Sequence, residues 1–230
     1  MDAIIMCAGL GTRLRPITNT IPKPLVPIAG RSSLERTLDM LPEAVTRIVL
    51  VVGYLADQIK ARIGTSYRGR EVVYVHQDTL DGTGGALRRA ESAIQSDRFL
   101  VLMGDDVYSS VDLERLAAHD KAILCYRAPA SGSLDAVQTD ETGHVCGFCR
   151  PEPGTEATLN TGAYTLDRHW FQTTPVLVPG KEDEWSLPHA IPQLIELGHP
   201  IHAIVATFWM PVGTHEQLAE AERLFLEKSE

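Results

Sequence analysis

The feature that most constrains the fold is a short apolar run followed at once by a loop of glycines, cations and prolines. Residues 3–8 read Ala-Ile-Ile-Met-Cys-Ala, a strand-length segment without a charged side chain. Apolar runs that do not alternate with polar residues suit parallel strands that are covered on both faces. The loop therefore leaves the end of a buried strand.

The loop over residues 9–27 has the composition of an anion-binding segment. Gly9 and Gly11 flank one leucine and permit a tight turn whose N–H groups face an anion. Arg13 and Arg15 add fixed positive charge, and Lys23 adds a mobile one. Three prolines stiffen the segment between the cations, so less ordering is needed when a polyphosphate binds. An ordinary turn with basic surface residues is the alternative interpretation.

Composition limits the partners of the chain. The net charge of −9 argues against a broad nucleic-acid surface, so an anionic ligand must be held by a local cluster of cations. Asp2 and the glycine loop interrupt the apolar start, and no apolar run is long enough to cross a bilayer. We therefore expect a cytoplasmic protein without membrane contact, and we expect residues 1–230 to form one domain because no linker divides them.

Strand and helix patterns alternate through the first half of the chain. This alternation predicts an α/β fold, with a Rossmann-like, mostly parallel sheet flanked by helices. In the second half the rhythm changes to a hairpin and further strands, which predicts a small antiparallel section. The expected strands are 47–52, 71–76, 99–103, 121–127, 136–139, 144–150, 160–166 and 201–207. The expected helices are 32–41, 57–63, 83–93, 112–119, 187–197 and 215–227. Ser32 and Glu35 resemble a capping box at the first helix, and Ser186 is the expected cap of the fifth. The last helix is amphipathic, with an apolar stripe of Leu218, Ala221, Leu224 and Phe225.

A pair of cysteines, Cys146 and Cys149, has the C-x-x-C spacing of zinc and redox sites. A zinc site needs a second ligand pair, and none is visible at a suitable spacing. The pair falls on an expected strand, where positions three apart face opposite sides. Unpaired thiols are the simpler interpretation.

The glycine loop carries a family resemblance. Gly9-Leu10-Gly11-Thr12-Arg13-Leu14-Arg15-Pro16, continued by Pro22-Lys23-Pro24-Leu25, resembles the signature of sugar-1-phosphate nucleotidyltransferases, and the resemblance covers nearly the whole chain. It implies the fold of nucleotide-diphospho-sugar transferases, with the antiparallel section binding the acceptor. It also implies two substrates, a nucleoside triphosphate and a sugar 1-phosphate. By this resemblance Arg13 and Lys23 are catalytic, and Ala8, Gly9, Gly11 and Thr12 bind the nucleotide.

A second glycine-rich stretch follows the third expected strand. Gln77 carries an amide that can match the donor and acceptor edge of a pyrimidine, and Gly82 and Gly84 let the backbone come close to a flat ring. The stretch is similar to the family's base-reading loop, which implies that Gln77, Gly82 and Thr83 bind the base and favours UTP or dTTP. A glycine-rich helix start is the alternative.

Two acids follow the fourth expected strand, at the edge where open α/β sheets collect ligands. A carboxylate there suits Mg²⁺, which prefers oxygen ligands. The family has a metal-binding aspartate after a glycine at this point, so the resemblance assigns Mg²⁺ to Asp105, whereas Asp106 caps a helix or assists. A purely structural turn is the alternative.

The acceptor side rests on three residues. Asn160 and Thr161 stand in a stretch similar to the family's sugar-binding strand, where Asn160 would bond to sugar hydroxyls. Taken alone, Asn-Thr-Gly is more typical of a turn or bulge. Arg150 replaces a lysine that contacts the acceptor phosphate in the family, and arginine can do so with two hydrogen bonds.

The chain departs from the family pattern at three positions. Cys149 replaces a glutamate, Ala136 replaces a glycine, and Pro211 replaces an aspartate that commonly supplies a second carboxylate to the metal. These changes keep two other functions open: a cytidylyltransferase for a phospho-alcohol or phosphonate, and a regulatory homologue with weak turnover. The sequence leaves open the sugar and the oligomeric state.

Overall fold

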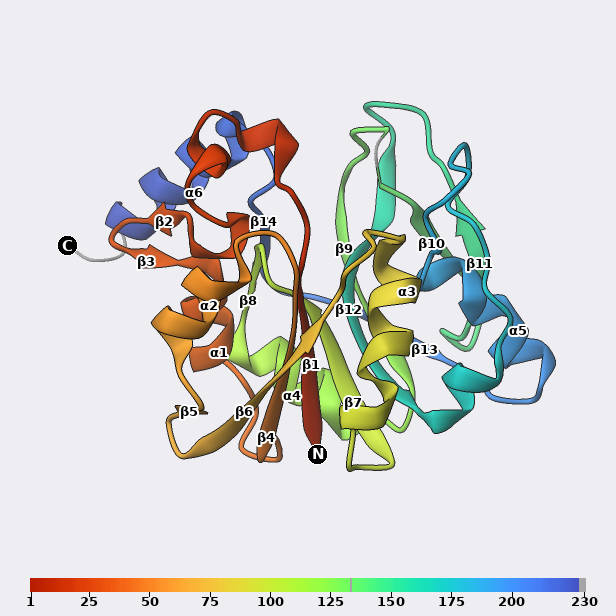
Figure 1. Ribbon diagram of the computed structural model, residues 1–230. Coiled ribbons are helices and arrows are strands. Elements are labelled where there is room, and N and C mark those ends of the chain that lie inside the picture. The colour runs from red at the N-terminus through yellow and green to blue at the C-terminus, as the bar shows by residue number, and fades with distance from the viewer. Residues whose placement is uncertain (133, 228–230) are drawn as a thin grey trace.

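The computed structural model describes residues 1–132 and 134–227 and centres on one large, mostly parallel sheet (Figure 1). The four parallel strands in its middle are β6 (Arg70–His76), β4 (Arg47–Val52), β1 (Asp2–Cys7) and β7 (Arg98–Met103). Next to β7 runs the long antiparallel β12 (Glu156–Asp167), followed by β9 (Ala122–Pro129) and β13 (His202–Val205). The predicted α/β class is confirmed.

Helices cover both faces of the sheet (Figure 1). One face carries α1 (Ser33–Asp39), α2 (Ala56–Ile63) and α4 (Ser110–Ala118). The other carries α3 (Gly82–Ala90) and α5 (Ile191–Glu196). The edges hold β5 (Ser66–Tyr67), which pairs with β6, and the predicted hairpin of β10 (Ala136–Thr139) and β11 (Val145–Cys149).

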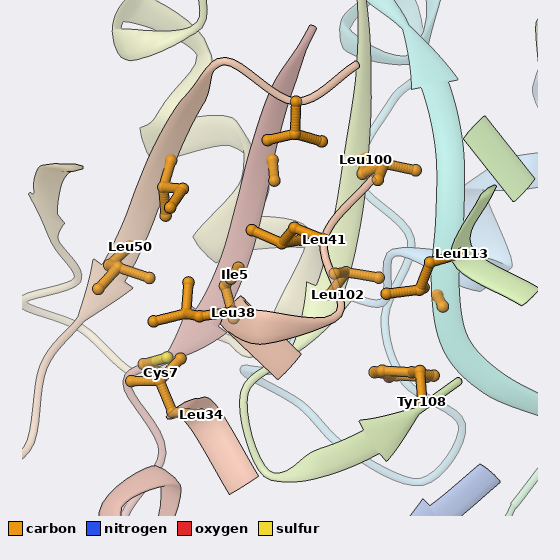
Figure 2. Close-up of a cluster of buried hydrophobic side chains, with 14 of the residues drawn as sticks. Ile5, Cys7, Leu34, Leu38, Leu41, Leu50, Leu100, Leu102, Tyr108 and Leu113 are labelled. Atoms are coloured by element: carbon orange, nitrogen blue, oxygen red, sulfur yellow. The ribbon is translucent and has the colours of Figure 1, made fainter. Parts of the chain in front are cut away.

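The core follows from the apolar strands. Side chains of β1 alternate between the two faces, so Ile5 and Cys7 join the cluster under α1 whereas Ile4 and Met6 join the cluster under α3. Figure 2 shows the first cluster, in which Leu34 of α1 lies beside Cys7 and Leu38 of α1 lies beside Ile5. A strand buried on both sides needs no polar alternation, which explains the run at residues 3–7.

Helix α1 begins as its sequence predicts. Ser32 Oγ accepts from the backbone N–H of Glu35 at 3.3 Å, and the Glu35 carboxylate accepts from the N–H of Ser32 at 3.1 Å. This reciprocal capping box satisfies two donors that a helix start leaves without partners.

The second half departs from prediction in two places. Strand β12 runs through Glu156–Asp167, longer than the expected 160–166. The expected helix 187–197 is a 3-10 turn, Pro188–Ala190, followed by α5. Pro188 and Pro192 lack backbone N–H donors, which prevents a continuous α-helical ladder at this start. The expected cap, Ser186, lies one residue before Leu187, which is the N-cap of this turn, although Ser186 Oγ does accept from the N–H of His189 at 3.2 Å.

Several short strands were not predicted, and two of them shape the site. β8 (Asp106–Tyr108) pairs antiparallel with β14 (Trp209–Pro211), and this pairing places Pro211 opposite Asp106. Three-residue strands have no measurable periodicity, so only the long-range pairing reveals them.

The C-terminal helix α6 (His215–Glu227) packs over the glycine loop (Figure 1). The predicted apolar stripe is confirmed, since Leu218 and Ala221 are buried against Leu14 and Ile28 in a third apolar cluster. The small ribbon of β2 (Pro27–Ile28) and β3 (Arg31–Ser32) lies beside it. The first and last segments of the chain therefore form one unit.

A buried carboxylate ties α4 to the segment that leads into β14. Asp112 Oδ2 accepts from Ser109 Oγ at 2.7 Å, from both the N–H and the hydroxyl of Thr207 at 2.8 Å, and from the N–H of Phe208 at 3.1 Å. Burial alone would raise the pKa of the Asp112 carboxyl, but these hydrogen bonds outweigh it and lower the pKa. The ionised form is therefore the stabilising one.

We expect Asp112→Asn to lower the free energy of unfolding by about 2 kcal/mol at neutral pH, because an amide cannot accept from all of these donors. A lowered folded-state pKa means that the stabilisation is present above the unfolded-state pKa of about 3.9 and disappears as the pH falls through the folded value. Urea unfolding at pH 7 and pH 3 should therefore show a difference from wild type that shrinks in acid. Asp120→Asn, at an exposed surface pair, should show no such difference.

Candidate active site

Three cavities meet at the carboxyl ends of β1 and β7. The glutamine cavity, of about 550 Å³, contains Gln77 and Gly9; the lysine cavity, of about 480 Å³, contains Lys23 and Gly11. The arginine cavity, of about 340 Å³, contains Arg150 and Asn160. Asp105 and Thr83 line all three, so the cavities meet at these two residues.

The loop after β1 is folded tightly, through three 3-10 turns: Thr12–Leu14, Ile17–Asn19 and Lys23–Leu25. Gly11 has a φ of +63°, and a Cβ on it would lie 2.9 Å from the Cβ of Lys23. Thr18 Oγ1 donates to the Gly11 carbonyl at 2.7 Å. Only glycine therefore satisfies both the left-handed backbone and the close approach of Lys23.

The predicted nucleotide-binding residues of this loop lie together. Ala8, Gly9, Gly11 and Thr12 line the glutamine cavity, and all but Ala8 also line the lysine cavity. A Cβ on Gly9 would meet no atom within 4 Å, so its backbone faces open space.

The two predicted cationic residues lie at the junction. Lys23 forms an ion pair with Asp105, and the two side chains are only 13% and 27% exposed. Arg13 lines both the lysine and the arginine cavities. A Cβ on Gly213 would lie 3.2 Å from Arg13 Nη2, so the segment after β14 fits closely against this guanidinium.

The backbone before Asp105 is held from two sides. A Cβ on Gly104 would lie 2.5 Å from Cys7 Sγ, so this position accepts only glycine without rearrangement. From α1, Ser33 Oγ donates to the Gly104 carbonyl at 3.0 Å and Thr37 Oγ1 donates to the Asp106 carbonyl at 2.8 Å. Asp105 therefore projects from a fixed turn.

Asp106 is buried at the start of β8 and lines the arginine cavity, and the following helix α4 is capped by Ser109 rather than by Asp106. Its Oδ2 accepts from Trp209 Nε1 at 2.9 Å. Burial, together with the charge of Asp105, raises the pKa of this carboxyl well above its usual range. Pro211, opposite Asp106, lines the arginine cavity beside Asp105 and has no side-chain oxygen to offer.

Gln77 is buried and oriented by two acceptors. Its Nε2 donates to Asp81 Oδ1 at 2.9 Å and to the Gly82 carbonyl at 3.1 Å. Because both partners can only accept, the amide orientation is fixed and the carbonyl oxygen remains to accept from a ligand. Arg89 pairs with Asp81 at 2.7 Å and holds this arrangement.

Positions 82 and 84 of the second loop require glycine for a contact within the protein, which the sequence did not predict. Gly82 has a φ of +84°, and a Cβ on it would lie 2.4 Å from the Trp185 carbonyl oxygen. A Cβ on Gly84 would lie 3.1 Å from the backbone of Ser186. The close approach is therefore to a strand-like segment of the second half, to which Thr83 Oγ1 also bonds by accepting from the Leu187 N–H at 3.2 Å.

The Asn-Thr-Gly stretch is a bulge that also lines the arginine cavity. The register of β12 against β9 shifts between Asn160 and Ala163. Asn160 Oδ1 accepts from the Gly162 N–H at 2.9 Å and lies 3.0 Å from the Tyr164 hydroxyl. The Thr161 hydroxyl donates to the Leu124 carbonyl at 2.7 Å, so it is committed to the sheet.

Sequence reasoning missed an acidic residue at the end of the arginine cavity. Asp135 pairs with Arg150 at 3.0 Å, and its other oxygen lies 3.6 Å from His189 Nε2. His189 Nδ1 lies 2.7 Å from Ser186 Oγ. No local pattern marks these residues, because they come together only through the packing of three separate segments.

The described residues contain no group of three or more His, Cys, Asp or Glu side chains arranged to hold a metal ion. Cys146 and Cys149 are exposed and unpaired on β11. Within residues 1–132 and 134–227, no helix has the length and apolarity needed to cross a membrane.

The fold and the convergent cavities are those of an α/β nucleotide-binding enzyme, and comparison with known proteins gives the family. A model of the nucleotidyl transferase family matches residues 2–228. The chain belongs to this family, and the resemblance to sugar-1-phosphate nucleotidyltransferases is confirmed.

Its relatives differ in length. UTP–glucose-1-phosphate uridylyltransferase AglF of Haloferax volcanii is 30% identical over 246 residues, covering 100% of this chain and 98% of that protein. The bifunctional protein GlmU of Methanococcus maripaludis is 32% identical over 232 residues, covering 99% of this chain and 55% of that protein. The chain thus spans about half the length of the GlmU proteins it matches.

Solved structures share the fold. HddC from Yersinia pseudotuberculosis, complexed with GMP-PN, has a TM-score of 0.75 and 26% identity, covering 97% of this chain and 99% of that one. A structure from Bacillus anthracis has a TM-score of 0.84 over 97% of this chain and 94% of that one, at 22% identity, and supports the fold alone.

Two glycines offer a matched test of the second loop. Gly82 and Gly69 have φ values of +84° and +79°, but a Cβ on Gly69 would meet nothing within 4 Å. We expect Gly69→Ala to cost about 1 kcal/mol from backbone strain alone, and Gly82→Ala to cost about 3 kcal/mol because it also displaces Trp185. Urea unfolding measures both losses; equal losses would remove the Trp185 contact as the reason for glycine.

Proposed function

We propose that this chain transfers a nucleotidyl group from a nucleoside triphosphate to a sugar 1-phosphate and releases pyrophosphate. One observation carries the proposal: three cavities converge on the Lys23–Asp105 pair, one lined by loop backbone and one by Arg150 and Asn160. Asp105 lines all three cavities, and Lys23 lines the lysine and arginine cavities. Such a junction suits a reaction in which two phosphorylated substrates meet. The name of the Haloferax volcanii relative, a glucose-1-phosphate uridylyltransferase, agrees with it.

The proposed reaction needs no general base. A phosphate monoester has a second pKa near about 6, so an oxygen of the sugar phosphate is already nucleophilic at neutral pH. It forms a bond to the α-phosphorus while the bond from that phosphorus to the β-bridging oxygen breaks, and pyrophosphate leaves with the electron pair. The protein then contributes positioning and charge neutralisation.

Arg13 and Lys23 supply that neutralisation. Arg13, at the border of the lysine and arginine cavities, holds the β- and γ-phosphates. Lys23 exchanges its contact with Asp105 for the α-phosphate and the acceptor phosphate, and so draws the two together. A low-exposure site strengthens both contacts, because little water screens them.

Asp105 fits a role as the residue that holds Mg²⁺. Its carboxylate projects from a fixed turn into all three cavities, and Mg²⁺ is commonly held by one or two carboxylates together with substrate phosphates. Bound there, Mg²⁺ would offset negative charge at the α-phosphate. Pro211 has no side-chain carboxylate to contribute, so we propose that the metal depends mainly on Asp105.

The nucleotide lies in the glutamine and lysine cavities. The backbone of Ala8, Gly9, Gly11 and Thr12 lines the phosphate path, and Gln77, Gly82 and Thr83 line the base end. The oriented Gln77 carbonyl accepts an N–H such as that of uracil or thymine, so we propose a preference for UTP or dTTP.

The acceptor lies in the arginine cavity, against Arg150, Asn160 and Thr161. Residues 1–230 act as one domain on these two small substrates, without nucleic acid or membrane. We propose that the protein acts in the cytoplasm, because all four cysteines are unpaired and disulfides are rare in that compartment.

A pyrophosphate-release screen tests the proposal. It crosses UTP, dTTP, CTP, GTP and ATP with a panel of sugar 1-phosphates, phospho-alcohols and phosphonates. We expect turnover with a sugar 1-phosphate, and faster turnover with UTP or dTTP than with GTP. GTP is the informative competitor because the HddC structure holds GMP-PN. Turnover only with CTP and a non-sugar acceptor, or tight nucleotide binding without pyrophosphate release, would overturn the assignment.

The metal assignment predicts opposite effects for two variants. Asp105→Asn should abolish Mg²⁺-dependent turnover and weaken Mn²⁺ binding in the presence of a non-hydrolysable triphosphate by about tenfold or more, because it removes the carboxylate that lines all three cavities. Pro211→Asp should lower the Mg²⁺ concentration needed for half-maximal rate, since it adds a carboxylate beside Asp105.

Mn²⁺ titration followed by electron paramagnetic resonance measures the binding independently of activity. Full activity in Asp105→Asn would place the metal elsewhere. An unchanged Mg²⁺ requirement in folded Pro211→Asp would mean that another carboxylate already serves; Glu184, which lines the lysine cavity with Asp105, is the one to test next.

A further inference from the structure

The arginine cavity holds three polar side chains that the proposed reaction leaves unexplained. Asp135, Ser186 and His189 line it together with Arg150, and these four residues come from three separate segments of the second half. Asp135 is 16% exposed and His189 is 20% exposed at the side chain. Carboxylates this withdrawn from water require partners, so the partners of Asp135 indicate what the site can accept.

The two oxygens of Asp135 have different surroundings. Oδ1 accepts from Arg150 Nε at 3.2 Å and from Arg150 Nη2 at 3.0 Å. Oδ2 faces His189 Nε2 at 3.6 Å, which is beyond hydrogen-bonding distance. Arg150 therefore balances the charge of Asp135 without using its second oxygen.

Ser186 and Asp135 together indicate which ring nitrogen of His189 carries a proton. The Ser186 hydroxyl oxygen accepts from the His189 backbone N–H at 3.2 Å, and it lies 2.7 Å from Nδ1. A bare Nε2 lone pair would face the Asp135 carboxylate at 3.6 Å, so we assign a proton to Nε2, and Nδ1 can then accept the Ser186 hydroxyl proton. The cavity thus presents a donor, His189 Nε2–H, and an acceptor, Asp135 Oδ2, across a gap of 3.6 Å.

A hydroxyl group complements this gap, because one oxygen can accept from Nε2–H while its proton goes to Oδ2. The position also suits a sugar: the backbone N–H of Asn160 donates to the Asp135 carbonyl at 2.9 Å, which fixes Asp135 beside the expected sugar-binding strand.

We propose that Asp135 and His189 together bind one hydroxyl of the acceptor sugar and so determine which sugar 1-phosphate is used. This rests on the proposed function. It also explains how the chain can lack the family's glutamate, whose place is taken by Cys149. Cys149 is exposed and does not line the cavity. Asp135 supplies a carboxylate from another segment and orients Arg150.

The test combines enzyme variants with altered substrates. The best sugar 1-phosphate for the wild-type enzyme is compared with its singly deoxygenated analogues. We expect one analogue to lose about 10- to 100-fold in kcat/KM, the range for a hydrogen bond to a charged group. Asp135→Asn should reduce kcat/KM for the parent sugar by a similar factor and leave that analogue nearly unaffected, so the discrimination disappears.

The KM for the nucleoside triphosphate should not change in Asp135→Asn, because a general loss of structure would alter both substrates. His189→Ala, on the other side of the gap, should remove discrimination at the same hydroxyl. Asp120→Asn, an exposed aspartate paired with Arg98 on the surface, is the matched control and should keep the wild-type preference.

The outcomes separate the two proposals. Wild-type turnover with sugar 1-phosphates, combined with discrimination that survives in both Asp135→Asn and His189→Ala, overturns this inference alone. Equal rates for the parent sugar and every analogue do the same. Absence of turnover with any sugar 1-phosphate overturns the proposed function, and this inference with it.

Discussion

The contact between Lys23 and Asp105 is the interaction on which the rest of the site depends. It joins a loop that follows β1 to a turn that follows β7, and these strands are neighbours in the sheet. Opposite charges at low exposure are held strongly only where the surrounding backbone is fixed. The chain provides this through Gly11, which lets Lys23 approach, and through Gly104, which lets the turn lie on Cys7. A substrate phosphate can then exchange for the carboxylate without rebuilding the site.

The periphery of the fold serves this junction. Helix α6 covers the glycine loop through the third apolar cluster, and His215 Nε2 lies 2.9 Å from the Arg15 carbonyl oxygen. From the other half, the Trp185 N–H donates to the Asp81 carbonyl at 2.7 Å, which joins the second half to the loop between Gln77 and Gly82. The arginine and glutamine cavities are therefore linked by backbone contacts, and a change in the segment around Trp185 is expected to affect both.

The departures from the family pattern have unequal consequences. Pro211 occupies the expected place beside Asp105 and removes a carboxylate there without an evident replacement on β14. Cys149 also removes a carboxylate, but the fold brings Asp135 to Arg150 from a different segment. The carboxylate missing at Pro211 is thus not replaced on β14, whereas the carboxylate missing at Cys149 is matched by Asp135 beside Arg150.

The sequence by itself determined the parallel core, the capping box of α1 and the amphipathic α6, because each depends on local periodicity or spacing. It also placed four residues in the converging cavities, because they belong to contiguous motifs: Arg13, Lys23, Gln77 and Asp105. Tertiary structure decided the β8–β14 pairing and the close approach of Gly82 and Gly84 to the backbone of residues 185–186. It also brought Asp135 next to His189. These depend on contacts between residues far apart in the chain. No local pattern encodes such contacts, since they exist only once the sheet has brought the segments together.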